Sequence, residues 1–474
     1  AAAAPLVLAG CKVRTINYFP VNPATVRFVN VMYPYAGLDG LHESVVVWAD
    51  LGFEGASDYA EFDNNRTSFS VRPTGTATDL ASAEITLTGK QPYSLIAFGA
   101  LGAPGLLLLP DAVSGGTGNT LIRLINVGLG APTVDVYVTA PDVNLDEVSP
   151  NFVGVSSGNS TVGLRMPPGT YRLRGTLNGT KALIYDSGTV ELAENASTNM
   201  MLYTLRSAYL MQCMLLPVSS TGAGAVVATS QVSAVKVVNA ALNAGTIDGF
   251  IDGTLFVNDV PYKEVTAYSF QTVGAHTLSF EATSTAGAAI ASLQRTLEST
   301  SDISGLVAGF PGAGQAIALA DGNIVPLAGE CRVRFVNGSS DSAAYDVYLG
   351  DTRLVSSLAA RTASDYFTLD AATYTVTFRD PASGATALTI ADQAIGESRV
   401  VTFYLAGAAG HQAGSRQQRL LLGGQGVRAA AVDVVEEMGV SRQARLGGDQ
   451  RGQAVGGDPQ HLGLEPADGF RIAD

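Results

Sequence analysis

Cys331-Arg-Val-Arg-Phe-Val-Asn337 opens the stretch of sequence that decides the fold, residues 331–376. Three further pieces follow it: Tyr345-Asp-Val-Tyr348, Ser364-Asp-Tyr366 and Ala372-Thr-Tyr-Thr-Val376. Each piece alternates apolar and polar side chains, and Gly, Asn, Asp or Ser separates the pieces. Alternation with a period of two places one face of a strand against a core and the other in water. The stretch therefore predicts short β-strands joined by turns.

The same pieces recur in the same order three times earlier in the chain. The opening strand ends in an asparagine each time, at Asn30, Asn126, Asn239 and Asn337. A period of about 100 residues with seven or so short strands is the size of an immunoglobulin-type sandwich. We therefore expect an all-β fold of four tandem immunoglobulin-like β-sandwich repeats. Asn after a strand commonly bonds its own backbone in a turn, so these four residues predict no chemistry.

The repeats and shifts in composition divide the chain into six segments. We expect residues 1–11 to be the last part of an export signal with a lipobox, and residues 423–474 to be a disordered tail. The four sandwich repeats lie between these ends, at residues 12–110, 118–217, 231–327 and 329–422. Residues 111–118 and 219–224, rich in Gly and Ser, predict flexible joints.

The C-terminal segment differs sharply in composition from the repeats. Residues 411–474 contain no Thr, Asn, Tyr, Trp or Lys and are dense in Gly, Gln and Arg. Arg419-Leu-Leu-Leu422 predicts the last strand of the fourth repeat, and residues 429–440 predict a short helix. The rest is expected to lack a packed core. A reading-frame error near the 3′ end is the alternative interpretation of so abrupt a change.

Composition limits the classes of partner. Hydrophobic residues make up 46% of the 474 residues, enough for several packed cores, and charged residues only 15%. The formal net charge is −14, and the chain holds five lysines. An acidic surface repels nucleic acid and anionic lipid headgroups, so we expect no nucleic-acid partner. No run reaches the 18 or more apolar residues of a membrane-spanning helix.

The N-terminal residues predict export. Leu8-Ala-Gly-Cys11 follows an apolar run and resembles the bacterial lipobox, in which cleavage precedes a cysteine that receives the lipid. Cys11 is therefore the predicted lipidation site, and the membrane is a predicted partner through that anchor. A buried first strand with an incidental cysteine is the alternative. Lipidation places the protein at the outer membrane, in the periplasm or on the cell surface.

The order Arg-Val-Arg-Phe-Val-Asn, Asp-Val-Tyr, Ser-Asp-Tyr, Thr-Tyr-Thr-Val resembles a bacterial family catalogued as domain of unknown function 4397. The resemblance is good over residues 331–405, fair over 120–217 and weak in the first and third repeats. Trp48 and Phe250 depart from the Asp-Val-Tyr pattern. The resemblance implies exported, often lipid-anchored, repeat β-sandwich proteins. It supplies no activity and no catalytic residues.

Motifs that suggest catalysis or metal binding have simpler explanations. Gly154-Val-Ser-Ser-Gly158 matches the nucleophile-elbow pattern, but it lies between β segments and the next histidine, His276, is in another repeat. The four histidines have no metal-ligand spacing, and no Cys-x-x-Cys occurs. Asp248, Asp252 and Asp259 suggest calcium only vaguely, because Asp-Gly is a common hairpin turn. We predict no catalytic residues, no metal site and no cofactor.

Tyrosines and cysteines complete the candidates. Tyr137, Tyr348 and Tyr366 are weak candidates for a ligand-binding platform, against the alternative that each ring packs in a core with its hydroxyl at the rim. Cys213 and Cys331 either pair in an oxidising compartment or are buried separately as small apolar side chains, which we favour.

These observations predict a non-catalytic, exported, lipid-anchored protein of the bacterial cell envelope with a structural or adhesive role. Loops at the ends of the sandwiches are the predicted contact surfaces for a protein or glycan partner. A glycan- or peptide-binding surface module is the first alternative. A secreted hydrolase is the second.

Overall fold

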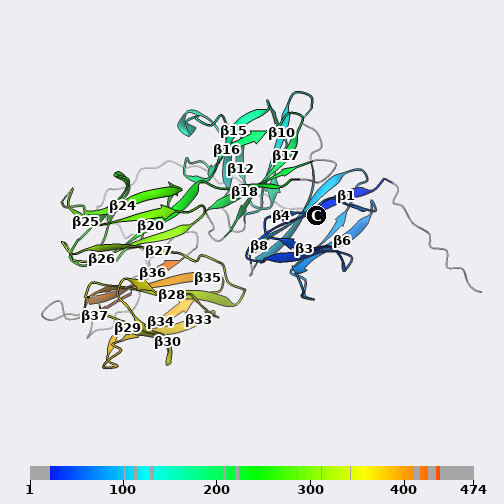
Figure 1. The fold of residues 1–474 in the computed structure, drawn as a ribbon. Coiled ribbons are helices and arrows are strands. Elements are labelled where there is room, and N and C mark those ends of the chain that lie inside the picture. Colours follow the sequence, from blue (N-terminus) through cyan, green and yellow to red (C-terminus); the bar gives the residue numbers. More distant parts are fainter. Residues whose placement is uncertain are drawn as a thin grey trace, which may run out of the picture. The chain divides into compact units, whose positions relative to one another are not determined.

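The computed structural model describes residues 22–100, 103–111, 116–128, 133–205, 210–218, 224–285, 287–310, 312–341, 343–408, 417–424 and 434–437 (Figure 1). All regular structure in these residues is strand, except one turn of 3-10 helix, η1 (Leu145–Glu147). The all-β prediction is therefore confirmed. No helix in these ranges has the length and apolar character to cross a bilayer.

Repeat 1 is built from strands β1 (Ala24–Met32), β2 (Gly37–His42), β3 (Val45–Gly52), β4 (Gly55–Ala56), β5 (Ala60–Phe62), β6 (Arg66–Pro73), β7 (Ala81–Thr86), β8 (Pro92–Ala100) and β9 (Ala103–Pro110). One sheet has the order β4-β1-β8-β9, and β5 pairs with β1 beside β4. The other sheet has the order β3-β2-β6-β7.

Repeat 2 is built from β10 (Thr120–Asn126), β11 (Val134–Thr139), β12 (Phe152–Val155), β13 (Asn159–Ser160), β14 (Leu164–Met166), β15 (Gly169–Leu177), β16 (Leu183–Leu192), β17 (Ser197–Thr204), β18 (Met211–Pro217) and β19 (Val226–Ala228). Its sheets have the orders β13-β10-β17-β18-β19, with β14 also on β10, and β12-β11-β15-β16.

Repeat 3 is built from β20 (Val232–Ala241), β21 (Ile247–Ile251), β22 (Thr254–Val260), β23 (Ser269–Thr272), β24 (Gly274–Ala282), β25 (Ala289–Leu297), β26 (Asp302–Gly309) and β27 (Gln315–Ala320). Its sheets have the orders β23-β20-β26-β27 and β22-β21-β24-β25.

Repeat 4 is built from β28 (Glu330–Ser339), β29 (Tyr345–Leu349), β30 (Thr352–Leu358), β31 (Thr362–Ala363), β32 (Phe367–Asp370), β33 (Ala372–Arg379), β34 (Thr386–Ile395), β35 (Arg399–Gly407), β36 (Gln417–Gly424) and β37 (Val434–Glu437). Its sheets have the orders β31-β28-β35-β36-β37, with β32 also on β28, and β30-β29-β33-β34. The expected last strand, Arg419–Leu422, lies within β36. The predicted short helix is wrong, because β37 is a strand that pairs with β36.

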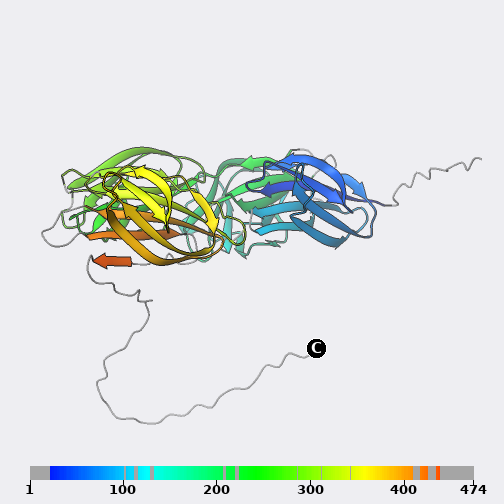
Figure 2. The ribbon, with the colours of Figure 1, turned by 90° about the horizontal axis from the view of Figure 1, so that it is seen from below.

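One strand order underlies all four sandwiches, and each has two sheets. Figure 1 and Figure 2 show these all-strand repeats from two sides. The first strand lies inside its sheet and pairs in parallel with the strand before the hairpin, as β1 with β8, β10 with β17, β20 with β26 and β28 with β35. This order differs from the ABED and CFG sheets of immunoglobulin constant domains. The β-sandwich prediction is confirmed, and the parallel pair is a feature that strand periodicity does not encode.

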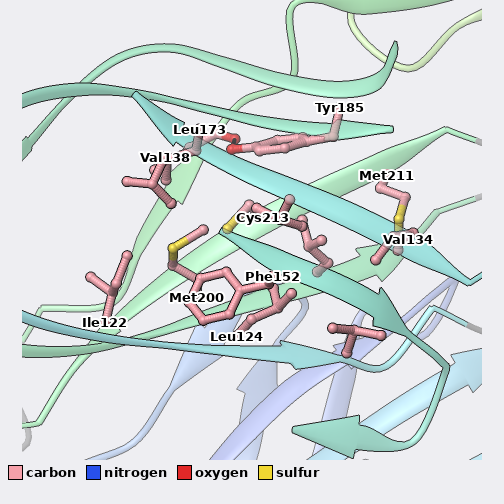
Figure 3. Close-up of a cluster of buried hydrophobic side chains, with 14 of the residues drawn as sticks. Ile122, Leu124, Val134, Val138, Phe152, Leu173, Tyr185, Met200, Met211 and Cys213 are labelled. Atoms are coloured by element: carbon pink, nitrogen blue, oxygen red, sulfur yellow. Dashed lines mark hydrogen bonds between the residues drawn. The ribbon is translucent and has the colours of Figure 1, made fainter. Parts of the chain in front are cut away.

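Each repeat encloses its own apolar core between its two sheets. In repeat 2, Leu124 and Met200 of one sheet and Val134 and Leu173 of the other contribute to one core (Figure 3). The intervening residues of β17 and β18 point away from this core yet are also apolar and buried, because a neighbouring repeat covers them. Strands buried on both faces have continuous apolar runs instead of alternation.

Candidate functional site

The recurring asparagine at or near the end of each opening strand joins the two sheets of its sandwich. Asn30, Asn126, Asn239 and Asn337 are all fully buried. In repeat 4, Oδ1 of Asn337 accepts the N–H of Ser339 at 3.0 Å, and Nδ2 donates to the Leu358 carbonyl on the other sheet at 2.9 Å. The other repeats have the same two bonds, to Met32 and Leu51, to Gly128 and Val155, and to Ala241 and Val260. The expected bond to its own backbone is present, and the inter-sheet bond is additional.

The aspartate that follows in each repeat stabilises a β-bulge in the third strand. Asp346 Oδ1 accepts the N–H of Ser357 at 2.7 Å, and Ser357 has a positive φ of 51°. The same bond joins Asp39 to the N–H of Asp50, Asp135 to that of Gly154, and Asp248 to that of Asp259. Each residue that donates its N–H has a positive φ. The Ser357 N–H and the Arg353 side chain hold the pKa of Asp346 below its ordinary value. These carboxylates therefore accept hydrogen bonds from backbone N–H groups.

A hydroxyl recurs at the break in the fourth strand. Ser364 Oγ accepts the N–H of Phe335 in the first strand at 3.0 Å, between β31 and β32. Ser57, Thr161 and Thr266 make the matching bond to Phe28, Leu124 and Val237. The serine of the Ser-Asp-Tyr piece therefore supplies a hydrogen bond at the point where the strand ladder is interrupted.

A cation lies three residues before the asparagine in every repeat. Arg27, Arg123, Lys236 and Arg334 are at most 9% exposed, and all lie on the outer face of the first-strand sheet. A buried charge requires a partner. Three of these cations pair with one of two aspartates, Asp111 and Asp321. Each aspartate follows the last strand of a repeat.

Asp111 lies between repeats 1 and 2. Its carboxylate is 3.5 Å from Arg27 and accepts bonds from Tyr59 at 2.5 Å and from Ser94 at 2.9 Å. Asn199 of repeat 2 donates to the same carboxylate at 2.7 Å. Asp111 is 2% exposed, so the prediction of a flexible joint is wrong for this residue. Residues 112–115 lie outside the described residues.

Asp321 has the corresponding position between repeats 3 and 4. Lys236 Nζ is 3.2 Å from Oδ2, Arg334 of repeat 4 pairs with Oδ1, and Tyr268 donates to Oδ2 at 2.5 Å. Ser304 donates to both oxygens. Burial works to raise the pKa of Asp321, yet Lys236 and Arg334 lower it below its ordinary value. The cluster is therefore an ionised, fully bonded group inside the protein.

The tyrosines predicted as weak ligand contacts are spread over two repeats and covered by cations. Lys181 lies 4.7 Å above the Tyr137 ring, and the Arg379 guanidinium lies 4.1 Å above the Tyr348 ring. Tyr366 contacts the guanidinium groups of Arg332 and Arg334 at 4.7 and 4.8 Å, and its hydroxyl accepts the Gly322 N–H. These geometries are cation–π contacts within the protein. The structure does not bring the three rings together.

The motifs for catalysis and metal binding are also taken up by local bonds. Ser156 of the elbow pattern has Thr133 as a partner at 3.2 Å, and Gly154 is the bulge residue of β12. His276 bonds Asp252 at 2.6 Å within its own repeat. Among the residues that the structure describes, no group of three or more His, Cys, Asp or Glu is placed to hold a metal ion.

The cysteines are separate. Cys213 is fully buried in the core of repeat 2 and Cys331 in that of repeat 4, and both are free. Burial raises the pKa of Cys213 to about 12, so its thiol is unreactive at neutral pH. The predicted lipidation site, Cys11, lies outside the described residues.

The interpretation of the sequence missed the roles of the four cations and the two aspartates. A signal for the cations was present, because Arg or Lys stands three residues before each recurring asparagine. Asp111 and Asp321 each follow a strand but belong to Gly-rich stretches, where composition indicates a loop. Their burial depends on side chains of the next repeat, and the period of the repeats is about 100 residues. A local pattern in the sequence therefore does not predict it.

Three stretches of the chain match one family model, described as Domain of unknown function (DUF4397): residues 24–137, 233–344 and 332–418. Together they cover more than half of the chain. The first and third repeats, in which the motif resemblance is weak, are matched, whereas residues 138–232 lie outside the three stretches. The first two stretches begin at an opening strand and extend past the opening strand of the next repeat. No curated protein matches the chain.

Proposed function

Because the chain belongs to the DUF4397 family, whose description assigns no activity, we propose from its own residues that it is a non-catalytic scaffold of the bacterial cell envelope. One observation carries this proposal. The polar side chains that recur from repeat to repeat bond to the backbone or to one another, as Asn337, Asp346 and Ser364 do. A repeated catalytic or binding site would instead present recurring polar groups to solvent.

The proposal includes a lipid anchor at Cys11, supported by the pattern Leu8-Ala-Gly-Cys11. A single acyl chain binds a membrane only marginally, so a stable anchor needs the several chains of a mature lipoprotein. The repeats would then stand at the membrane surface in a structural or adhesive role.

Replacing Cys11 by Ala in the full-length precursor tests the anchor. We expect the variant to move from the membrane fraction to the soluble fraction, while Cys213→Ala, a buried control, stays with the membranes. Mass spectrometry of the native protein should find a lipid on Cys11. An unmodified peptide spanning residues 1–11 on protein purified from cells would contradict the anchor.

The scaffold role has its own test, independent of the anchor. Purified protein should leave generic ester and glycoside substrates unchanged, and a glycan array should show no binding by the soluble Cys11→Ala variant. Ester hydrolysis that Ser156→Ala abolishes would establish a hydrolase. Binding to one glycan class that Tyr348→Ala or Tyr366→Ala abolishes would establish the binding-module alternative.

A further inference from the structure

We propose that the outer face of each first-strand sheet is a repeat-recognition surface, which binds another sandwich of the same family. Through this surface the chain forms two rigid pairs, repeats 1–2 and repeats 3–4. One hinge, between repeats 2 and 3, joins the two pairs. The partner is defined by its chemistry. An aspartate after the last strand of the odd repeat binds polar groups on the first-strand sheet of the even repeat. This inference goes beyond the proposed scaffold role and holds wherever the protein resides.

The first support is the apolar packing of sheet on sheet within each pair. Between repeats 1 and 2 the outward side chains of β1, β8, β10, β17 and β18 form one buried cluster that includes Val29, Ile96, Ile125, Met201 and Met214. Between repeats 3 and 4 the corresponding cluster includes Val238, Leu306, Val336, Tyr404 and Ala406. Equivalent strands therefore meet across both junctions.

The second support is reciprocity. Arg27 of repeat 1 donates to the Pro217 carbonyl of repeat 2 at 2.8 Å, and Arg123 of repeat 2 donates to the Pro110 carbonyl of repeat 1 at 2.6 Å. Pro110 and Pro217 end equivalent strands, β9 and β18. Exchange of equivalent contacts is the mark of a two-fold, isologous interface. The face is thus complementary to a copy of itself.

The third support is the aspartate that breaks this symmetry. Asp111 and Asp321 follow the last strands of repeats 1 and 3, and both accept bonds from the next repeat, from Asn199 and from Arg334. Arg334 also donates to the Ala320 carbonyl at 2.7 Å, as Arg123 does to Pro110. Val218 stands at the equivalent position after β18 in repeat 2. An odd repeat therefore carries the acidic half of the contact, and repeat 2 lacks it.

The junction between repeats 2 and 3 is built differently. Its buried apolar cluster has three fully buried members, Leu210, Val232 and Ala234. The Gln231 N–H bonds the Asp186 carbonyl at 2.7 Å, and Gln212 contacts Ser299 at 3.5 Å. Neither of these two bonds involves a charged side chain, whereas Asn199 bonds the Asp111 carboxylate across repeats 1 and 2 and Arg334 pairs with Asp321 across repeats 3 and 4. The chain should bend here before it bends within a pair.

Single-molecule energy transfer on the full chain tests the proposal. Dyes are placed in a Cys11→Ala background, where Cys213 and Cys331 are buried, at the exposed positions Ser82, Thr170, Gln294 and Ser356, one in each repeat. We expect narrow distance distributions between Ser82 and Thr170 and between Gln294 and Ser356. The distribution between Thr170 and Gln294 should be broad. If the distance distribution between repeats 2 and 3 is as narrow as the other two, before any interface residue is changed, the hinge is overturned.

Charge removal tests the recognition itself. Asp321→Asn should broaden the distribution between repeats 3 and 4 and leave that between repeats 1 and 2 unchanged, and Asp111→Asn should do the reverse. Asp380→Asn, in an exposed hairpin turn of repeat 4, is the matched control. An unchanged distribution in both variants would overturn the aspartate's role. Arg334→Lys, which keeps the charge but loses the fork that bonds Ala320, should broaden the same distance and serves if Asp321→Asn does not fold.

Discussion

At the scale of single residues, the recurring polar side chains have structural explanations. Asn337 satisfies two backbone groups on separate strands, and Asp346 satisfies the N–H of a residue with positive φ. A buried polar group without a partner is costly, so each such side chain stabilises a backbone geometry that the strand ladder alone would leave unbonded.

Asn337→Ala should lower the free energy of unfolding of the part of the chain that contains repeat 4 by about 2–4 kcal/mol, because it leaves buried backbone groups of Leu358 and Ser339 without partners. Asn258→Ala, at an exposed position of strand β22, should change stability by less than about 0.5 kcal/mol. Urea unfolding followed by circular dichroism measures both. Equal small effects would show that the buried asparagine does not join the sheets.

Asp346 gives a pH prediction with a defined sign. Its pKa is lower in the folded protein, chiefly because of the Ser357 N–H, than the value of about 3.9 in an unfolded chain. The carboxylate therefore stabilises the fold above about pH 4, and this contribution is lost as the pH falls through the folded pKa. The stability difference between wild type and Asp346→Asn should shrink from pH 6 to pH 3. A difference that grows toward low pH would contradict the assignment.

At the scale of elements, the third strand of each sandwich depends on its bulge. Ser357 has a positive φ, which a β-branched side chain tolerates poorly. Its neighbour Ser356 does not have a positive φ. Ser357→Val should destabilise repeat 4 by about 1–2 kcal/mol. Ser356→Val, exposed on the same strand, should be neutral or slightly stabilising because valine favours strands. Thermal unfolding of the two variants should therefore shift by clearly different amounts, and equal shifts would contradict the bulge geometry.

The elements were largely predictable from the sequence, whereas their pairing was not. Alternation in Cys331–Asn337 and Tyr345–Tyr348 identified β28 and β29, because the period of side chains is local. The parallel pairing of β28 with β35 joins residues far apart in the chain, and no local pattern specifies it. The same limit applies to the candidate site. The turn role of the asparagines followed from sequence, but the burial of Asp111 depends on the neighbouring repeat.

At the scale of the whole molecule, repeats 1–2 and 3–4 are expected to be the cooperative units. Asp321 neutralises Lys236 in its own repeat and binds Arg334 in the next, so neither repeat can leave the other without exposing or stranding a charge. Removing one partner of a buried ion pair typically costs about 3–5 kcal/mol, well above the effect of a surface pair.

Lys236→Met should therefore be less damaging than Asp321→Asn. Lys236→Met leaves Asp321 paired with Arg334, whereas Asp321→Asn leaves two buried cations without a carboxylate. We expect a loss of about 3–5 kcal/mol for the aspartate variant and a smaller loss for the lysine variant. Chemical unfolding of both variants, with Lys90→Met at an exposed position as the control substitution, checks the order. The reverse order would show that the lysine and not the aspartate holds the cluster together.

Scanning calorimetry of the full chain tests the central claim most directly. Paired repeats predict two cooperative transitions for wild type, one for repeats 1–2 and one for repeats 3–4, because each pair shares a buried apolar interface and a buried aspartate that bonds the next repeat. Asp321→Asn should lower the temperature of one transition and leave the other in place, and Asp111→Asn should affect only the other. Four independent transitions in the wild type, or equal shifts of both transitions by either variant, would contradict the account.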